Sequence, residues 1–217
     1  MRTPAQPPAA PTACITDLVV VVPASELSAA VDGVLCGTRI TALGPSGDLE
    51  SECLAVATRN RPLGEYRPVF IVASTATILS IGPLVAALRS GLATNHVPIA
   101  LADPDSDIDI LWGHIFDAGL ITNPPGPDTG EPPLVATVSK ATHSRTTVAP
   151  LRIVRMGQAA LAEWLAIDAA SDHSLTLIDG TERDDLTTIA RTIHHRPLTI
   201  GTPTLLRELL RIHTVTN

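Results

Sequence analysis

The chain has 217 residues, 45% of which are hydrophobic, so it is long enough to bury one large core, and its composition argues against global disorder. Aromatic residues make up only 2%, so the core must be built from Val, Leu, Ile and Ala, which favours buried parallel strands flanked by Ala-rich helices. The formal net charge of −7 argues against nucleic acid or an anionic membrane as the main partner.

The N-terminal residues and the cysteines indicate the cellular compartment of the protein. Residues 1–12 are rich in Pro and Ala and lack the apolar segment of a signal peptide, so we expect a disordered leader before one α/β domain over residues 13–217. No apolar run is long enough to cross a bilayer. The cysteines Cys14, Cys36 and Cys53 lack the spacing of a metal site and fit a reducing compartment. The sequence therefore predicts a cytoplasmic protein.

Strands and helices alternate through the first half of the chain. Aliphatic and β-branched runs predict strands at Ile15–Val22, Arg39–Leu43, Val69–Ser74 and Val97–Leu101. Helices are predicted between them, at Ser25–Cys36, Asp48–Ala57 and Leu84–Leu92. This alternation is typical of a mainly parallel, doubly wound, Rossmann-like sheet with helices on both faces.

The middle of the chain is less regular. Residues 123–133 hold five prolines and two glycines, and this composition predicts a loop. Residues 138–150 are rich in Ser, Thr and His and predict no definite element. A strand is then predicted at Leu151–Met156.

The last third returns to the alternation of strands and helices. A helix is predicted at Gln158–Ala170, with Trp164 as an anchor in the core. Thr181 is expected to cap the next helix, whose first turn Asp184 would support. A strand around Ile200, a glycine turn and a final helix then complete the domain, so chemistry that needs a second domain would have to come from another chain.

Common catalytic and metal-binding motifs are missing from the sequence. It contains no Gly-x4-Gly-Lys, Gly-x-Gly-x-x-Gly, His-Glu-x-x-His or Gly-x-Ser-x-Gly. Asp105–Asp109 alternates like a calcium loop, but Ile110 and Phe116 stand where that loop needs Gly and Glu, so we expect a solvated acidic loop. His194 and His195 are expected to complement the end of a helix. We therefore expect no metal site and no cofactor in this chain.

Small molecules bind in open α/β sheets beyond the carboxyl ends of the strands. Three polar segments of this sequence are predicted to lie at or near such strand ends. They contain Ser25, Glu26 and Ser28, then Arg59 and Arg61, then Ser74 and Thr75. Together they would form a partly cationic crevice suited to a small hydroxylated acid. The alternative interpretation is purely structural: Ser25 caps a helix, the arginines pair with surface acids, and the Ser/Thr turn satisfies backbone groups.

At these segments the chain resembles the sugar-binding N-terminal domain of the four-carbon acid sugar kinases. Ser25–Ala30 is similar to the family's Asp-Asp-Leu-Thr-Gly-Ala, and Val56–Leu63 to its Thr-x-Ser-Arg segment, with Arg61 kept. Phe70–Gly82 is similar to its Lys-Lys-x-Asp-Ser-Thr-Leu-Arg-Gly-Asn-Ile-Gly, and Leu175–Leu206 to the end of its domain. The resemblance spans about residues 13–212 in order, and it implies a sugar-acid-binding fold.

The chain also departs from this family. Ile71 and Val72 replace the Lys pair, Ile78 replaces an Arg, and the segment Asp103–Trp112 is acidic where the family has Gly-Arg. The family's C-terminal nucleotide-binding domain has no counterpart in the sequence. The chain alone is therefore not expected to act as a kinase, and whether it is an enzyme is left open.

Three functional hypotheses follow. The first is a stand-alone, diverged domain that binds a small sugar acid or other carboxylate: Glu26 and Ser28 would bind hydroxyls, Arg61 with Arg59 the carboxylate, and Ser74 and Thr75 would add hydrogen bonds. The second is a non-catalytic interaction or regulatory module, for example a homodimer. The third is one half of a split kinase, with Mg-ATP bound by a separate nucleotide-binding partner.

Overall fold

The structure is a computed structural model that describes residues 18–22, 41–43, 49–59, 65, 67–122, 132–171 and 175–215. The predicted leader and the helix expected at Ser25–Cys36 lie outside the described residues, as does the proline-rich segment 123–131. Cys14 and Cys36 also lie outside them, whereas Cys53 is buried.

Seven parallel strands form the main sheet, in the order β2-β1-β3-β10-β4-β9-β8. Their bounds are β1 Val19–Val21, β2 Thr41–Leu43, β3 Val69–Val72, β4 Val97–Ala100, β8 Thr146–Ala149, β9 Leu175–Ile178 and β10 Leu198–Gly201. All residues of β3, β4, β9 and β10 are buried, as expected for central strands covered on both faces. The predicted α/β fold with a mainly parallel sheet is confirmed.

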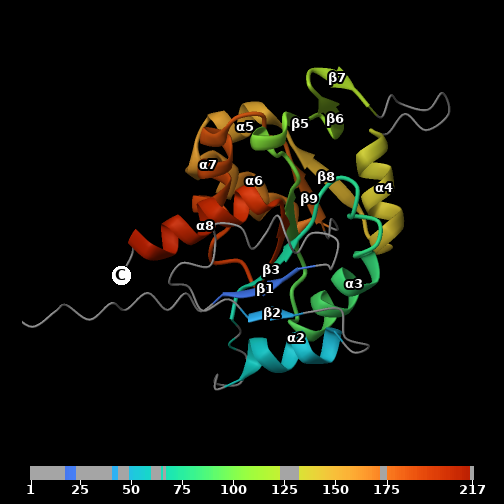
Figure 1. Cartoon of the computed structure of the whole chain (residues 1–217), viewed down its shortest axis with the longest axis vertical. Coiled ribbons are helices and arrows are strands. Elements are labelled where there is room, and N and C mark those ends of the chain that lie inside the picture. The colour runs from blue at the N-terminus through green and yellow to red at the C-terminus, as the bar shows by residue number, and fades with distance from the viewer. Residues whose placement is uncertain are drawn as a thin grey trace, which may run out of the picture.

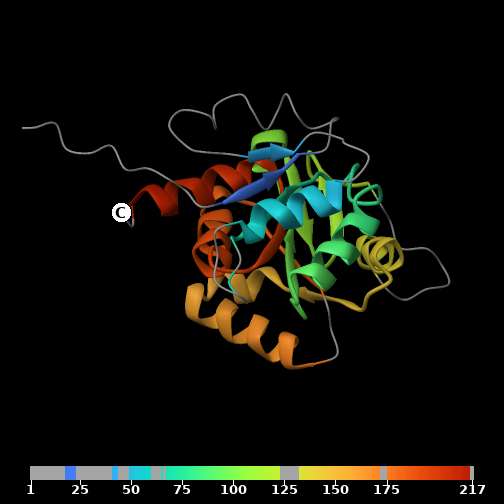
Figure 2. The same ribbon diagram turned by 90° about the horizontal axis from the view of Figure 1, so that it is seen from below.

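Helices cover both faces of this sheet (Figures 1 and 2). The first layer contains α2 Leu49–Thr58, α3 Gly82–Gly91 and α4 Pro133–Thr142, and the second contains α5 Leu151–Arg155, α6 Gln158–Ala170, α7 Arg183–Ile193 and α8 Pro203–Val215. Contacts run from α2 to α3 to α4 in one layer and from α5 to α8 through α6 and α7 in the other. Crossovers between parallel strands are almost always right-handed, so the face on which a helix lies depends on the direction in which the chain moves along the sheet. Here the chain moves from β2 towards β8 through the first layer and returns towards β10 through the second.

A small antiparallel sheet begins within the segment that was expected to be an acidic loop. After the 3-10 turn η2 (Pro104–Ser106), the strands β5 Ile108–Leu111, β6 His114–Asp117 and β7 Leu120–Ile121 form consecutive hairpins. The β5–β6 turn places Trp112 and Gly113 at φ of 54° and 72°, the left-handed region that a two-residue hairpin turn requires. Backbone hydrogen bonds between Ile110 and Gly180 fasten this sheet to the end of β9. The expectation of a solvated acidic loop is therefore right for the exposed residues Asp105, Ser106 and Asp107 and wrong for Ile108 and Asp109, which belong to β5.

Two more local predictions were wrong for physical reasons. Leu151–Arg155 is a helix rather than a strand, because it follows Pro150 directly and its first N–H group is bound by a buried carboxylate, described below. The N-cap of α7 is Glu182 rather than Thr181: Glu182 and Asp185 form a reciprocal capping box.

The predicted helix Gln158–Ala170 is confirmed with the same bounds. Its core residues are Leu161 and Leu165, which are fully buried, whereas Trp164 is only half-buried and packs against the edge of the core. None of the helices in the described part of the chain is both long and apolar enough to cross a membrane.

Candidate functional site

The carboxyl ends of all seven strands lie at one edge of the main sheet. Four neighbouring strands there lead to alternating layers: β3 to α3, β10 to α8, β4 by way of the small sheet to α4, and β9 to α7. Connections that leave in opposite directions open a crevice between the strands, and ligands of open α/β sheets bind in such crevices. The segments that follow these strands are therefore the candidates for a ligand-binding site.

The turn after β3 carries Ser74 and Thr75, two of the predicted binding residues. Ser74 N–H donates to Thr77 Oγ1 at 2.9 Å, and the hydroxyl oxygens of Ser74 and Thr77 are 3.2 Å apart. Ser74 O accepts hydrogen bonds from the N–H groups of Thr77 and Ile78. Both predicted residues are half-buried at the carboxyl edge, and Ser74 together with Thr77 also closes a local turn.

Arg59 lies at the other edge of the sheet. It follows the last residue of α2, and Arg67 N–H donates to Ala57 O at 2.9 Å just before β3 begins. Ser74 follows the other end of β3, and an extended chain from Arg67 to Ser74 spans about 20 Å. The structure thus brings Ser74 and Thr75 together but does not place Arg59 beside them. Ser25, Glu26, Ser28 and Arg61 lie outside the described residues.

A cluster of ion pairs at the carboxyl edge was not predicted. Asp105, in the segment after β4, accepts hydrogen bonds from Arg207 Nη1 at 2.6 Å and from Arg183 Nη2 at 2.7 Å. Burial acts to raise the pKa of Asp105, but the hydrogen bonds and charges of the two arginines outweigh it and hold that pKa below its usual range. The result is a carboxylate clamped between two partly exposed guanidinium groups.

Further hydrogen bonds tie this cluster to β10 and α8. Thr204 Oγ1 donates to Asp103 at 2.6 Å, and Arg207 Nη2 donates to Thr204 Oγ1 at 3.2 Å. Thr202 Oγ1 donates to Ala102 O at 3.0 Å, which joins the ends of β10 and β4. The cluster therefore lies over the β10–β4 crevice, one strand away from the Ser74 turn.

Asp179, at the end of β9, is a buried carboxylate at the same edge. Its oxygens accept from the backbone N–H groups of Trp112 at 2.8 Å, Leu151 at 3.2 Å and Gly113 at 3.5 Å. Burial raises the pKa of Asp179 to about 6, although these three hydrogen bonds favour the ionised form. Because its bonds join the small sheet to α5, we assign this carboxylate a structural role.

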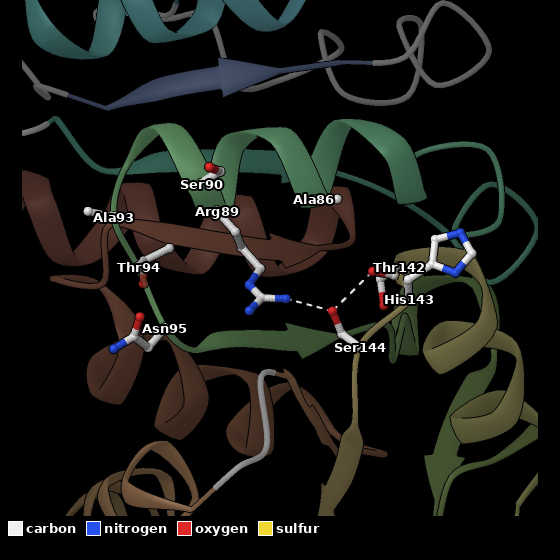
Figure 3. Close-up of a pocket in the computed structure, with 9 residues that line it drawn as sticks. All are labelled: Ala86, Arg89, Ser90, Ala93, Thr94, Asn95, Thr142, His143 and Ser144. Carbon is white, nitrogen blue, oxygen red and sulfur yellow. Dashed lines mark hydrogen bonds between the residues drawn. The ribbon is translucent and has the colours of Figure 1, made fainter.

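The described residues contain no group of three His, Cys, Asp or Glu side chains that could hold a metal ion. At the amino edge, between the C-terminal ends of α3 and α4, there is a pocket of about 480 Å³ (Figure 3). Candidate polar sites therefore lie at both edges of the sheet: the ion-pair cluster at the carboxyl edge and this pocket at the amino edge.

These features define an open, doubly wound α/β domain with a polar carboxyl edge. No protein-family model matches the chain, and no curated protein matches it. Solved structures do. A DUF1537 protein from Haemophilus influenzae is 16% identical with a TM-score of 0.66, over 78% of this chain and 43% of that one. A protein from Salmonella typhimurium LT2 is 17% identical with a TM-score of 0.69, over 91% and 57%.

A third similar structure is a DUF1537 domain from Bordetella bronchiseptica, crystallised with bound citrate as a domain-swapped dimer. It is 15% identical with a TM-score of 0.55, over 92% of this chain and 56% of that one. The chain spans about half the length of these structures. At such low identity the likeness establishes the fold alone.

Proposed function

We propose that the domain binds a small hydroxylated carboxylic acid at the carboxyl edge of its main sheet. The observation that carries this proposal is the clamp on Asp105, because two arginines at the crevice already bind one carboxylate there. Arginine is suited to this task because its planar fork can bind a carboxylate through two parallel hydrogen bonds. The citrate bound to the Bordetella bronchiseptica domain lends support, since citrate is a small hydroxylated acid.

In this proposal the outer N–H groups of Arg183 and Arg207 bind the ligand's carboxylate. Both side chains remain partly exposed, at 47% and 35%, so a ligand can reach them. Ser74 and Thr75, one strand away, add hydroxyl groups for the hydroxyls of the acid. The sequence-predicted residues Ser25, Glu26, Ser28 and Arg61 belong to the same proposal through the resemblance.

Phosphoryl transfer is not part of this proposal. In the resembled family the ATP site belongs to a second domain, so that activity would need such a domain elsewhere in the protein or in a partner. Copurification with a nucleotide-binding protein, together with phosphorylation of a sugar acid by the pair, would establish the split-kinase alternative.

A second candidate function is assembly with another copy of the chain. The small sheet exposes apolar side chains at Trp112 (61%) and Leu120 (73%), and β7 is its short edge strand. The domain-swapped dimer of the Bordetella bronchiseptica domain favours this candidate. Sedimentation analysis of the wild type and of Leu120→Lys tests it: a dimer that becomes monomeric supports the role, and a monomeric wild type contradicts it.

Titration calorimetry with citrate and with four-carbon sugar acids tests the binding proposal. Arg207→Gln should weaken binding about 10- to 100-fold, because it removes a charge-assisted hydrogen bond to the ligand. Arg211→Gln is the matched control, since Arg211 lies one turn further along α8 and pairs with Glu208. Equal affinity of wild type and Arg207→Gln, or no binding of any of these acids to the wild type, would contradict the proposal.

A further inference from the structure

The pocket at the amino edge is separate from the proposed binding site. It lies where α3 and α4 end and where β4 and β8 begin, on the face covered by the first helix layer. Its volume of about 480 Å³ is within the range of small-molecule sites. Figure 3 shows Thr94 and Asn95 on one side of it and Thr142, His143 and Ser144 on the other.

Arg89 is the charged centre of this pocket. Its side chain reaches from α3 towards the start of β8, where Nη1 donates to Ser144 Oγ at 2.6 Å (Figure 3). Its Nε is buried and has no hydrogen-bond partner among the described residues. Burial also lowers the pKa of Arg89, since it removes water from the charged guanidinium. The residue as a whole is only half-buried, so an anion could approach the accessible part of the guanidinium and restore the lost charge stabilisation.

The remaining lining is compatible with an anion. None of the nine residues around the pocket is acidic, although the chain as a whole carries a net charge of −7. The Asn95 amide and the His143 imidazole offer further N–H donors, and Ser90 offers a hydroxyl.

The helix ends at this pocket need separate consideration, because the C-terminal carbonyl groups of a helix repel an anion. Here several of those carbonyls are already bonded: Leu88 O accepts from Leu92 N–H, Arg89 O from Thr94 N–H, and Ser139 O from Ser144 N–H. Their partial negative charge is therefore partly offset by backbone donors, which leaves the guanidinium as the dominant charge in the pocket.

We propose that this amino-edge pocket is a second ligand site, which binds a small oxyanion, carboxylate or phosphate, through the Arg89 guanidinium. The site is independent of the carboxyl-edge clamp, because the length of the strands separates them and no residue belongs to both. The domain would then bind two anionic ligands, one at each edge of its sheet.

Amide chemical shifts of the wild type, titrated with inorganic phosphate and separately with acetate, locate the ligand. Saturable shifts of the amide signals of Asn95 and Ser144 are expected with at least one ion, and the tighter of the two identifies the preferred chemistry. Arg89→Gln should weaken that binding about 10- to 100-fold. Arg207→Gln, at the opposite edge, should leave it unchanged.

Two further variants separate ligand binding from a purely structural role of Arg89. Ser144→Ala removes the internal hydrogen bond but keeps the guanidinium, so anion binding should persist. Ser90→Asp adds a negative charge to the exposed rim with Arg89 in place, and binding should be lost. The proposal is overturned if neither ion shifts the pocket amides, or if Ser90→Asp binds the anion as the wild type does.

Discussion

The buried carboxylate of Asp179 accepts a hydrogen bond of 2.8 Å from the backbone N–H of Trp112, which stands 67 residues earlier in the chain. This bond fastens the β5–β6 turn to the end of β9, and the N–H of Leu151 shares the same oxygen. One side chain thus connects the small sheet, the main sheet and α5. Its ionisation should be visible in the stability of the whole domain.

Stability should fall as the pH rises through the titration of Asp179. Its pKa is raised from 3.8 to about 6, so between these values the folded state binds more protons than the unfolded state, and the free energy of unfolding decreases with increasing pH. The shift corresponds to about 3 kcal/mol, fully present below pH 4 and lost above pH 6. Asp179→Asn keeps an acceptor oxygen but cannot ionise, so it should lack this dependence.

Urea unfolding at pH 4 and pH 7.5 measures the effect as the difference between wild type and variant. Asp179→Asn should gain about 2–3 kcal/mol relative to the wild type between the two pH values. Asp117→Asn, an exposed carboxylate on β6, reports the general effect of losing one acidic charge. If the free energies of unfolding of wild type and Asp179→Asn differ by the same amount at both pH values, the raised pKa of Asp179 is contradicted.

Close packing of α3 on α4 gives a second prediction. A Cβ atom added at Gly82 would lie 2.1 Å from Ala141 O, which is backbone and cannot turn aside. Gly82→Ala should therefore lower the free energy of unfolding by about 1–3 kcal/mol, despite the better helix propensity of Ala. Urea unfolding measures the change.

Gly91→Ala, at the other end of α3, is the matched control. Its Cβ would meet the side-chain end of Leu54, at 2.5 Å, and this flexible group can move. The loss should be clearly smaller than for Gly82→Ala. If Gly82→Ala is as stable as the wild type, α3 and α4 cannot be packed as closely at Gly82 and Ala141 as described here.

The parts of the fold that sequence could predict are those set by local hydrophobic pattern. The run Val69–Val72 is uniformly buried, and the helix Gln158–Ala170 has its predicted bounds. The run Leu151–Arg155 also contains aliphatic and β-branched residues, yet it forms a helix whose first N–H is held by Asp179, 28 residues later. Such a long-range bond leaves no trace in a local pattern, so the prediction there failed.

The candidate site was less accessible to prediction for the same reason. Placing Ser74 and Thr75 at the carboxyl edge required only the end of a predicted strand. Pairing Asp105 with Arg183 joins residues 78 positions apart, and it depends on the order of strands β4 and β9 in the sheet. The acidic alternation at Asp105–Asp109 indicated charge, but nothing local indicated which arginines would meet it.

A buried chain of polar side chains provides the last prediction: it links β9, α6 and the residue just before β4. Thr176 Oγ1 donates to the carboxylate of Asp168 and lies 2.6 Å from His96 Nε2, and all three residues are buried. Thr176→Val keeps the shape of the side chain but removes the hydroxyl from between the two groups. The free energy of unfolding should fall by about 2–4 kcal/mol, because buried polar groups on both sides lose a partner.

Thr147→Val is the matched control, because Thr147 is the residue paired with Thr176 on the neighbouring strand β8 and is only half-buried. The same loss of a hydroxyl should cost less than about 1 kcal/mol there, since water can replace the missing partner. Both variants are compared with the wild type by urea unfolding at neutral pH. If the two cost the same, the hydroxyl of Thr176 does not link His96 to Asp168, and this chain of hydrogen bonds is not a source of stability.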